Sequence, residues 1–268
     1  MASVDVRFSG SIPANYERYM VPLLFRPYAD LLAERAAKLQ PNRILETAAG
    51  TGVVTAALAA MLPDADIVAT DLNQAMLDVA ETRVSSPNVT FRQADALELP
   101  FEDASFDLLV CQFGLMFYPD KVKGNAEARR VLRDDGAYLF AVWDGIERNL
   151  LSHLANESMR KAFPDNPPQF MVRGPFSYHE PEWIERDLRA AGFEDIRIET
   201  VNLTSRSPSA EDAARGLCYG SPMGVELEEY GPGALDYVFA NLTQSASEYQ
   251  GPDGFEAPMA AHIVTAVK

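Results

Sequence analysis

The sequence contains little that would support a membrane protein, a disulfide-stabilised protein or a metalloprotein. Its two cysteines among 268 residues form neither a disulfide framework nor a metal-ligand pattern. No run of about 18 consecutive apolar residues occurs, so we expect no membrane-spanning helix. The first residues, MASVDVRFSGSIP, lack the apolar segment of a signal peptide. These absences predict a cytoplasmic protein without a bound metal.

Basic residues are also scarce. The sequence has 23 lysines and arginines against 39 acidic residues, which gives a net charge of −16. Because affinity for a phosphate backbone comes mainly from clustered lysine and arginine, we expect no nucleic-acid partner. The same charge disfavours strongly anionic substrates, although it could simply keep the protein soluble. With 47% hydrophobic residues the chain can bury a sizeable core, and a small molecule is the expected partner.

A strand, a turn and a helix are expected in succession at residues 44–62, where ILETAAGTG is followed by VVTAALAAML. The short apolar run ends at Glu46, and Gly50 and Gly52 permit a tight turn that a ligand can approach closely. The helix then presents unpaired N–H groups and the positive end of its dipole to that ligand. This arrangement predicts a nucleotide-type pocket. The side chains expected on the buried side of the helix are Val53, Val54, Leu58 and Met61.

The loop and the strand after it narrow the choice of nucleotide. A dinucleotide-binding turn requires a third glycine, but Thr55 occupies its place, which argues against a NAD-dependent oxidoreductase. A second apolar run, ADIVATDL, ends in Asp71, 19 residues after Gly52. A carboxylate there can accept hydrogen bonds from both hydroxyls of a ribose, although it could instead stabilise the start of the next helix. Asn73 is the expected N-cap of that helix.

Three further segments continue the pattern, namely ATDLN, QADALELPFEDASFDLLVCQFGLMF and VLRDDGAYLFAVW. Together with ILETAAGTG, in this order and at this spacing, they resemble the class I S-adenosylmethionine (SAM)-dependent methyltransferases. The resemblance is to the broad small-molecule group that includes the ubiquinone and menaquinone methyltransferases, and it covers residues 40–145. It implies an α/β fold, Rossmann-like and doubly wound, with a mostly parallel seven-stranded sheet and helical lid insertions. Ala48 replaces the glycine of many members, but a small residue still fits.

The resemblance also implies SAM as the cofactor and gives roles to individual residues. In the family, the acid at Glu46 helps to hold the methionine end of SAM, although a carboxylate so placed could equally bond the amides of the loop. Tyr16 lies in a segment that folds over the cofactor in this family, unless it is an ordinary packing residue. The implied cofactor-binding residues are Tyr16, Glu46, Ala48, Gly50, Gly52, Asp71, Leu72, Asp95, Ala96, Gln112 and Phe113.

The adenine and the methyl group of SAM are expected near the ends of the following strands. In the family, the acid at Asp95 accepts a hydrogen bond from the adenine amine, and the N–H of Ala96 meets a ring nitrogen. Leu72 would flank the adenine, while Asp95 could alternatively be a turn residue. Gln112 and Phe113 would face the cofactor near its methyl group, although Gln112 could otherwise satisfy buried backbone groups.

We expect the chain to divide into a cofactor-binding core and segments added to it. Cap helices occupy residues 1–39, and the core comprises residues 40–203 and 262–268, with an insertion at 145–180. A second insertion, 204–261, is expected to be a helical lid whose aromatic residues form a substrate pocket. Those aromatics could instead pack on the main sheet or on a second subunit, as in a homodimer. The remaining expected elements are helices at 119–135 and 181–193 and strands at 106–113, 137–144, 194–203 and 262–268.

The chemistry expected of such an enzyme is methyl transfer to an oxygen, nitrogen or carbon atom of an apolar or aromatic metabolite. The methyl group of SAM is already electrophilic, so the protein mainly has to align the acceptor and exclude water. A hydroxyl or an acidic carbon would benefit from a general base. The candidates are His153 and His179, neither of which is assigned as catalytic, whereas His262 is expected to be structural. The alternatives are a quinone-type C-methyltransferase, a NAD-dependent oxidoreductase and a non-catalytic SAM-binding protein.

Overall fold

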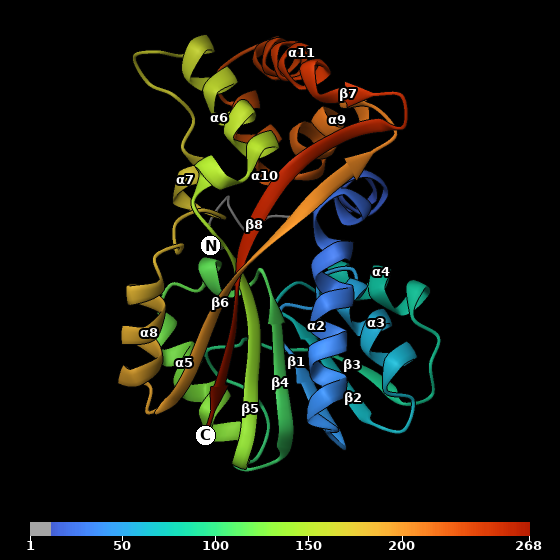
Figure 1. Cartoon of the computed structure of the whole chain (residues 1–268), viewed down its shortest axis with the longest axis vertical. Coiled ribbons are helices and arrows are strands. Elements are labelled where there is room, and N and C mark those ends of the chain that lie inside the picture. The colour runs from blue at the N-terminus through green and yellow to red at the C-terminus, as the bar shows by residue number, and fades with distance from the viewer. Residues whose placement is uncertain (1–11) are drawn as a thin grey trace. The chain divides into compact units, whose positions relative to one another are not determined.

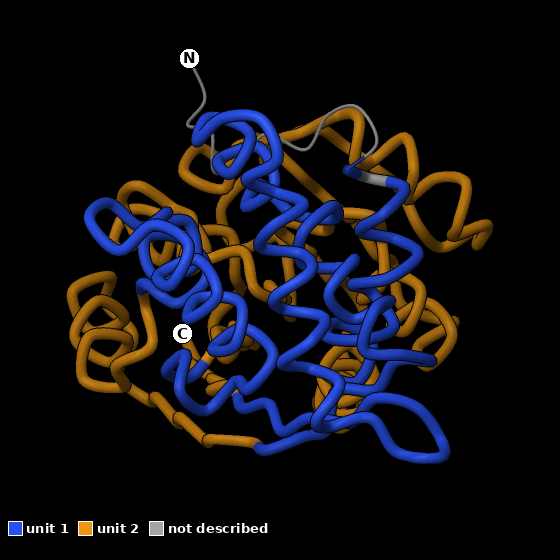
Figure 2. Tube along the Cα trace, turned by 90° about the horizontal axis from the view of Figure 1, so that it is seen from above, with its two compact units in different colours: residues 1–27, 144–177, 202–260 blue, residues 28–143, 178–201, 261–268 orange. Residues whose placement is uncertain are grey.

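The computed structural model describes residues 12–268, and the chain forms two compact units (Figure 2). The core unit consists of Tyr28–Trp143, Tyr178–Val201 and Ala261–Lys268. The insertion unit consists of the residues up to Pro27, Asp144–Ser177 and Asn202–Ala260. The N-terminal segment is therefore grouped with the two insertions, and not with the sheet that directly follows it in the sequence.

The strands form an eight-stranded sheet of order β3-β2-β1-β4-β5-β8-β6, with the short β7 paired to β8 (Figure 1). Strands β1 to β5 pair with one another in parallel, and β8 is antiparallel to β5. The predicted Rossmann-like, mostly parallel fold is confirmed. The strands are β1 Arg43–Glu46, β2 Asp66–Asp71, β3 Val89–Gln93, β4 Phe106–Gln112, β5 Leu132–Trp143, β6 Asp195–Ser207, β7 Gln250–Gly251 and β8 Gly254–Val267.

Helices cover both faces of the sheet in the core unit, as a parallel sheet requires. Helices α2, α3 and α4 lie on one side, and α5 and α8 lie on the other (Figure 1). The central strands β4 and β5 are almost wholly buried, and Phe106, Tyr138 and Phe140 are among their fully enclosed side chains. The helices are α2 Arg26–Leu39, α3 Val53–Met61, α4 Gln74–Arg83, α5 Lys121–Val131 and α8 Pro181–Ala190, with the short 3-10 turn η3 Leu115–Phe117.

Two local predictions can be compared directly with the core unit. Asn73 caps α4 as predicted, because its side-chain oxygen accepts a hydrogen bond from the N–H of Ala75 at 3.0 Å. The prediction that Met61 is buried is wrong, since this side chain is 43% exposed, whereas Val53, Val54 and Leu58 are buried. Met61 is the last residue of α3, so no further helical turn covers its side chain.

The insertion unit is mainly helical. Its N-terminal helix η2 (Tyr16–Phe25) is a π-helix that packs closely on α9 (Ala210–Gly220). A Cβ atom on Gly220 would lie 3.0 Å from the backbone nitrogen of Tyr16, and one on Gly216 would lie 3.3 Å from the Cβ atom of Tyr19. The remaining elements are α1 Ile12–Asn15, η4 Ile146–Arg148, α6 Leu150–Ala162, α7 Phe170–Arg173, α10 Pro222–Glu228, α11 Ala234–Ala246 and η5 Ser247–Tyr249.

Strands β6 and β8 are longer than the sequence predicted. β6 continues to Ser207 and β8 begins at Gly254, so both strands enter the range 204–261 that was expected to be a helical lid. The helices of that range lie between Ala210 and Ala246. None of the helices described between residues 12 and 268 combines the length and hydrophobicity needed to cross a bilayer.

Candidate functional site

The predicted ligand site lies where the strand order of the sheet reverses. β1 has β2 on one side and β4 on the other, and the chain proceeds from β1 to β2 but from β4 to β5. In open α/β sheets, ligands bind outside the carboxyl ends of the strands at such a point. The last residues of β1, β2 and β4 are Glu46, Asp71 and Gln112. Three of the predicted site residues therefore end strands at the same edge of the sheet.

The loop after β1 is held between its two neighbouring strands. The N–H of Thr47 donates to the carbonyl of Val110 at 2.9 Å, and the N–H of Ala49 donates to the carbonyl of Thr70 at 2.9 Å. Ala48 has a φ of 53°, in the left-handed region that glycine adopts most readily. This conformation explains why glycine suits the position, and the small side chain of alanine is accommodated there.

Gly52 serves two purposes at the start of α3. Its φ of 78° is left-handed, and it is the N-cap of the helix. A Cβ atom at this position would also lie 2.9 Å from the Cβ atom of Ala80 in α4. Gly52 therefore allows both the turn into α3 and the close packing of α4 against that turn.

Glu46 is a buried carboxyl group beside the first turn of α3. It is only 1% exposed, and the hydroxyl of Thr55 donates to its Oε2 at 2.6 Å. Burial raises the pKa of Glu46 to about 8, and the nearby Asp71 adds to the rise, whereas the hydrogen bonds from Thr55 oppose it. A cation bound at this edge of the sheet would favour the ionised form of Glu46.

The raised pKa of Glu46 makes the stability of the free protein depend on pH. Between pH 4.5 and about 8, the folded state holds a proton that the unfolded state has released. Stability from this group is complete at low pH, so the free energy of unfolding should fall as pH rises, by about 1.4 kcal/mol per pH unit. Glu46→Gln should remove this dependence, as measured by chemical denaturation at several pH values. The exposed Glu98→Gln should retain it, and parallel curves for wild type and Glu46→Gln would contradict the prediction.

Asp71 connects the end of β2 to the loop. Its Oδ2 accepts a hydrogen bond from the N–H of Gly50 at 2.9 Å, and its Oδ1 accepts one from the N–H of Asn73 at 2.8 Å. Burial raises the pKa of Asp71, although both of these hydrogen bonds lower it. Each carboxylate oxygen can accept more than one hydrogen bond, so Asp71 retains the capacity to bind ribose hydroxyls.

The charge of the carboxyl groups of Glu46 and Asp71 indicates which kind of nucleotide this site can bind. They interact unfavourably with each other, so this edge favours a cationic ligand and opposes the pyrophosphate of a dinucleotide. SAM carries a sulfonium and an ammonium group, and its ribose has the hydroxyls that Asp71 can accept. The residues present therefore fit SAM better than they fit NAD.

The residues predicted around the adenine lie at the ends of β2 and β3. Leu72 is 55% exposed and so offers an uncovered apolar surface directly after Asp71. The N–H of Ala94 donates to the carbonyl of Asp71 at 3.0 Å, which brings the β3 loop beside it. Asp95 is exposed, and its Oδ1 accepts from the N–H of Leu97 at 2.8 Å, the turn contact considered as its alternative role. Ala96 is half-buried within this turn.

The end of β4 carries a buried aromatic cluster. Gln112 is half-buried, and Phe113 follows it with a φ of 53°. The ring of Phe113 stacks on Trp143 with 3.7 Å between centroids and 4° between planes, and Tyr28 contacts it edge-on at 5.4 Å. One face of Phe113 is therefore covered by protein.

The other predicted residues are distributed between the units. Tyr16 is in the insertion unit, where its ring stacks on Phe25 with 5.0 Å between centroids. His153 is in α6 of the same unit, whereas His179 is in the core unit with its Nε2 3.2 Å from Oε1 of Glu180. The structure thus gathers the residues of the β1 loop and the β2 end, but it does not place Tyr16 or His153 relative to them.

His262 has the structural environment that the sequence suggested. It is 2% exposed, and its Nε2 donates to the carbonyl of His179 at 2.8 Å. With that tautomer, its Nδ1 accepts from the hydroxyl of Thr200 at 3.0 Å. Both ring nitrogens are engaged, so His262 is not a candidate base.

Two threonines that support the site were missed as functional residues. Thr55 bonds the carboxyl group of Glu46, and the hydroxyl of Thr70 donates to the carbonyl of Glu46 at 2.8 Å. In the sequence, Thr55 occupies the place of the third glycine of a dinucleotide-binding turn, and no other role was predicted for it. The available signal was its place in the first turn of the helix, within reach of an acid at the preceding strand end.

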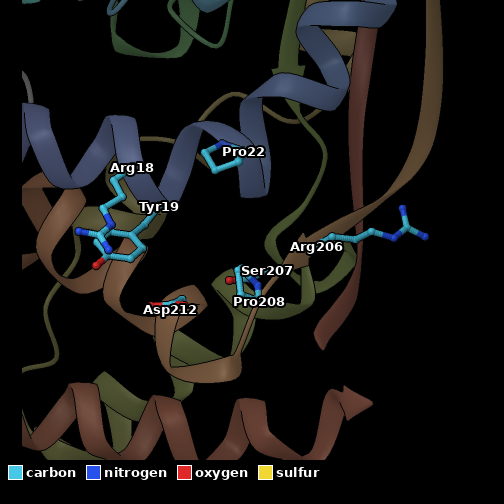
Figure 3. Close-up of a pocket in the computed structure, with 7 residues that line it drawn as sticks. All are labelled: Arg18, Tyr19, Pro22, Arg206, Ser207, Pro208 and Asp212. Atoms are coloured by element: carbon cyan, nitrogen blue, oxygen red, sulfur yellow. The ribbon is translucent and has the colours of Figure 1, made fainter. Parts of the chain in front are cut away.

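The insertion unit has a pocket of its own, lined by residues of η2, the end of β6 and the start of α9 (Figure 3). The guanidinium carbon of Arg18 lies 5.1 Å from the ring centroid of Tyr19. Arg206 is directed away from the other lining residues and forms an ion pair with Glu256 at 2.8 Å. The lining residues are Arg18, Tyr19, Pro22, Arg206, Ser207, Pro208 and Asp212.

Comparison with known proteins identifies the family to which this chain is related. Residues 44–136 match a family described as a methyltransferase domain. The demethylmenaquinone methyltransferase of Clavibacter sepedonicus is 34% identical over 179 residues, which cover 63% of this chain and 71% of that enzyme. The ubiquinone/menaquinone biosynthesis C-methyltransferase UbiE of Idiomarina loihiensis is 30% identical over 180 residues, which cover 59% of this chain and 69% of that enzyme.

A solved structure supports the same fold at lower sequence similarity. Phosphoethanolamine N-methyltransferase 2 of Haemonchus contortus, crystallised with S-adenosyl-L-methionine, has a TM-score of 0.62 and 19% sequence identity. The match covers 100% of this chain and 60% of that chain. This match shows the fold alone, and the two relatives from Clavibacter sepedonicus and Idiomarina loihiensis confirm the family resemblance inferred from the sequence.

Proposed function

This chain belongs to the class I SAM-dependent methyltransferases, and we propose that its acceptor is a small, uncharged aromatic or apolar metabolite. The observation that carries the proposed cofactor site is the pair of carboxyl groups, Glu46 and Asp71, at adjacent strand ends beside the first turn of α3. The net charge of −16 disfavours an anionic acceptor, because anionic molecules would be repelled.

SAM supplies an electrophilic methyl group, and the residues of this chain bind it and orient the acceptor. In our proposal, Glu46 gives up its proton and holds the ammonium group of SAM, while Asp71 accepts from the ribose hydroxyls. Leu72 and Ala96 contact the adenine, and Gln112 lies towards the methyl end. Gly50 and Gly52 let the cofactor approach the loop without a side chain between them.

A quinone-type C-methyltransferase is the more specific candidate within this function. The relatives from Clavibacter sepedonicus and Idiomarina loihiensis are named as methyltransferases of demethylmenaquinone and of ubiquinone or menaquinone biosynthesis. An acceptor of that kind is a hydroxylated ring whose carbon becomes nucleophilic when a hydroxyl loses its proton. His153 and His179 are the proposed candidates for that proton transfer. We further propose that the enzyme is cytoplasmic and acts without nucleic acid.

The proposed acceptor class can be tested with SAM carrying a labelled methyl group. We expect label transfer to a naphthohydroquinone or a catechol, because these rings are uncharged and hydroxylated. Transfer to an oligonucleotide or to a phosphorylated amine should be undetectable under the same conditions. A protein that methylated only the anionic compounds would contradict the proposed acceptor, while leaving its membership of the family unaffected.

A further inference from the structure

The pocket of the insertion unit is formed by three segments that lie far apart in the sequence (Figure 3). Helix η2 contributes Arg18, Tyr19 and Pro22. The last residue of β6 contributes Ser207, and the first turn of α9 contributes Asp212. All of these residues belong to the insertion unit. The cavity has a volume of about 250 Å³, which is slightly smaller than the pockets that hold drug-sized ligands. It can therefore admit a small molecule.

Helix η2 has an unusual backbone where it borders this pocket. It is a π-helix of ten residues, and Pro22 lies inside it. π-Helical turns are rare and occur frequently at functional sites, and a proline within a helix cannot donate a backbone hydrogen bond. The helix is nevertheless packed closely on α9, where a Cβ atom on Gly216 would lie 3.3 Å from the Cβ atom of Tyr19. This side of the pocket is therefore a well-packed part of the unit.

Arg18 supplies a positive charge to the pocket. Its guanidinium carbon lies 5.1 Å from the ring centroid of Tyr19, and no carboxylate within residues 12–268 forms an ion pair with it. Arg206, which also lines the pocket, is instead paired with Glu256 at 2.8 Å. Because a cation–π contact does not use the N–H donors of an arginine, the guanidinium of Arg18 remains available to an anionic group.

Asp212 supplies a negative charge from the α9 side of the pocket. Its backbone N–H donates to Oγ of Ser209 at 3.0 Å, whereas its carboxylate has no hydrogen bond or ion pair with any residue in the described part of the chain. The preceding residue, Glu211, differs because it is paired with Arg215 at 2.8 Å. Asp212 and Arg18 are not paired with each other either, so both charges are available to a ligand.

We propose that this pocket binds a small zwitterion, a molecule with a carboxylate and an ammonium group joined by a short apolar chain. The carboxylate pairs with the guanidinium of Arg18, which can donate two parallel hydrogen bonds to it, and the ammonium group pairs with Asp212. Pro22 and Pro208 line the same pocket and offer rigid apolar surfaces to the connecting chain. A simple anion is repelled by Asp212 and a simple cation by Arg18, so the pocket favours a molecule that carries both charges.

Binding at this pocket requires neither SAM nor a methyl acceptor. Every lining residue comes from the insertion unit, and the predicted cofactor residues at the ends of β1 and β2 belong to the core unit. A bound zwitterion joins η2 to the start of α9. Because a ligand that binds only the folded state stabilises it, the zwitterion should raise the melting temperature of the protein.

The test is calorimetric titration of the whole chain with glycine, β-alanine and 4-aminobutyrate, in which the two charges are increasingly far apart. Butyrate and butylamine, which each carry only one of the charges, are the comparison compounds. We expect at least one of the zwitterions to bind ten times more tightly than either comparison compound and to raise the melting temperature. The titrations are made at physiological ionic strength, where long-range attraction of a cation to this acidic protein is screened.

Four substitutions test whether the zwitterion binds in this pocket. Arg18→Gln and Asp212→Asn each remove one of the two available charges and should weaken binding at least fivefold. Arg206→Gln and Glu211→Gln remove the same charges from residues that are already paired within the protein, so they should leave the affinity unchanged. Glu211 and Asp212 both lie in the first turn of α9, so their variants lose the same interaction with the helix dipole. All four side chains are exposed or half-buried, and the variants should fold.

Three results would overturn the inference. The first is that none of the three zwitterions binds. The second is that butyrate or butylamine binds as tightly as the best zwitterion, which would indicate a site for a single charge. The third is that Arg18→Gln and Asp212→Asn keep the affinity of wild type, because the ligand would then bind elsewhere. Methyl transfer to an aromatic acceptor is a separate measurement, and its failure would bear on the proposed function alone.

Discussion

Gly52→Ala is expected to destabilise the protein by about 2–5 kcal/mol and to weaken SAM binding more than tenfold. A left-handed conformation costs an L-residue about 1–2 kcal/mol, and the φ of Gly52 is 78°. The new methyl group would also lie 2.9 Å from the Cβ and 3.3 Å from the Cα of Ala80, so α4 would have to move. Overpacking of this kind typically costs a further 1–3 kcal/mol, or roughly the same again. Because the loop is fixed by this glycine, its displacement should also disturb the cofactor site.

Gly233→Ala provides a matched control for this substitution. Gly233 is the N-cap of α11, has a φ of 84° and would place its Cβ atom in open space. Gly233→Ala should therefore show only the cost of the left-handed backbone conformation, without a steric clash. Chemical denaturation of both variants and titration with SAM measure the two effects. Equal destabilisation by Gly52→Ala and Gly233→Ala would show that the contact with α4 is unimportant.

Asp71→Ala is expected to weaken SAM binding by about 1–3 kcal/mol, which corresponds to a 5- to 150-fold rise in Kd. The reason is that the ribose hydroxyls would lose their acceptor in a largely enclosed site. The N–H groups of Gly50 and Asn73 would also lose their partner, so circular dichroism must show that the variant is folded. Calorimetric titration with SAM measures the effect.

Asp66→Ala is the appropriate control, since Asp66 is exposed and begins the strand that Asp71 ends. Asp66 lies at the amino end of β2, whereas the predicted site lies at the carboxyl end. Asp66→Ala should therefore leave the affinity for SAM unchanged. A folded Asp71→Ala variant with the affinity of wild type would remove the ribose assignment, although the family membership would stand.

The cofactor loop could be predicted from the sequence because its signals are local. A short apolar strand, two glycines and an amphipathic helix follow one another, and each has a direct physical reason. The position of Asp71 followed from the next apolar run. The role of Thr55 could not be predicted, because its contact with Glu46 depends on how α3 packs against the end of β1. The raised pKa of Glu46 likewise depends on three-dimensional burial.

The extent of the last strands was harder to predict for two different reasons. Most residues of β6 are exposed or half-buried, so the strand lacks the apolar run that marks a buried one. β8 contains Pro258, and proline within a run of residues argues against a strand. The first half of β8 lies in the range 204–261, for which a helical lid was predicted.

The grouping of the N-terminal segment with the insertions also lacked a local signal. It depends on the contacts of Gly216 and Gly220 with η2, which join residues about two hundred positions apart. Glycines in a helix have many explanations in a single sequence, and only the structure shows which element approaches them.

The most direct test of the central claim is calorimetric titration of the protein with SAM, S-adenosylhomocysteine and NAD under identical conditions. The carboxyl groups of Glu46 and Asp71 at adjacent strand ends predict binding of SAM and S-adenosylhomocysteine, and no measurable binding of NAD. Binding of NAD without binding of SAM would contradict this account and would make the loop after β1 a dinucleotide site.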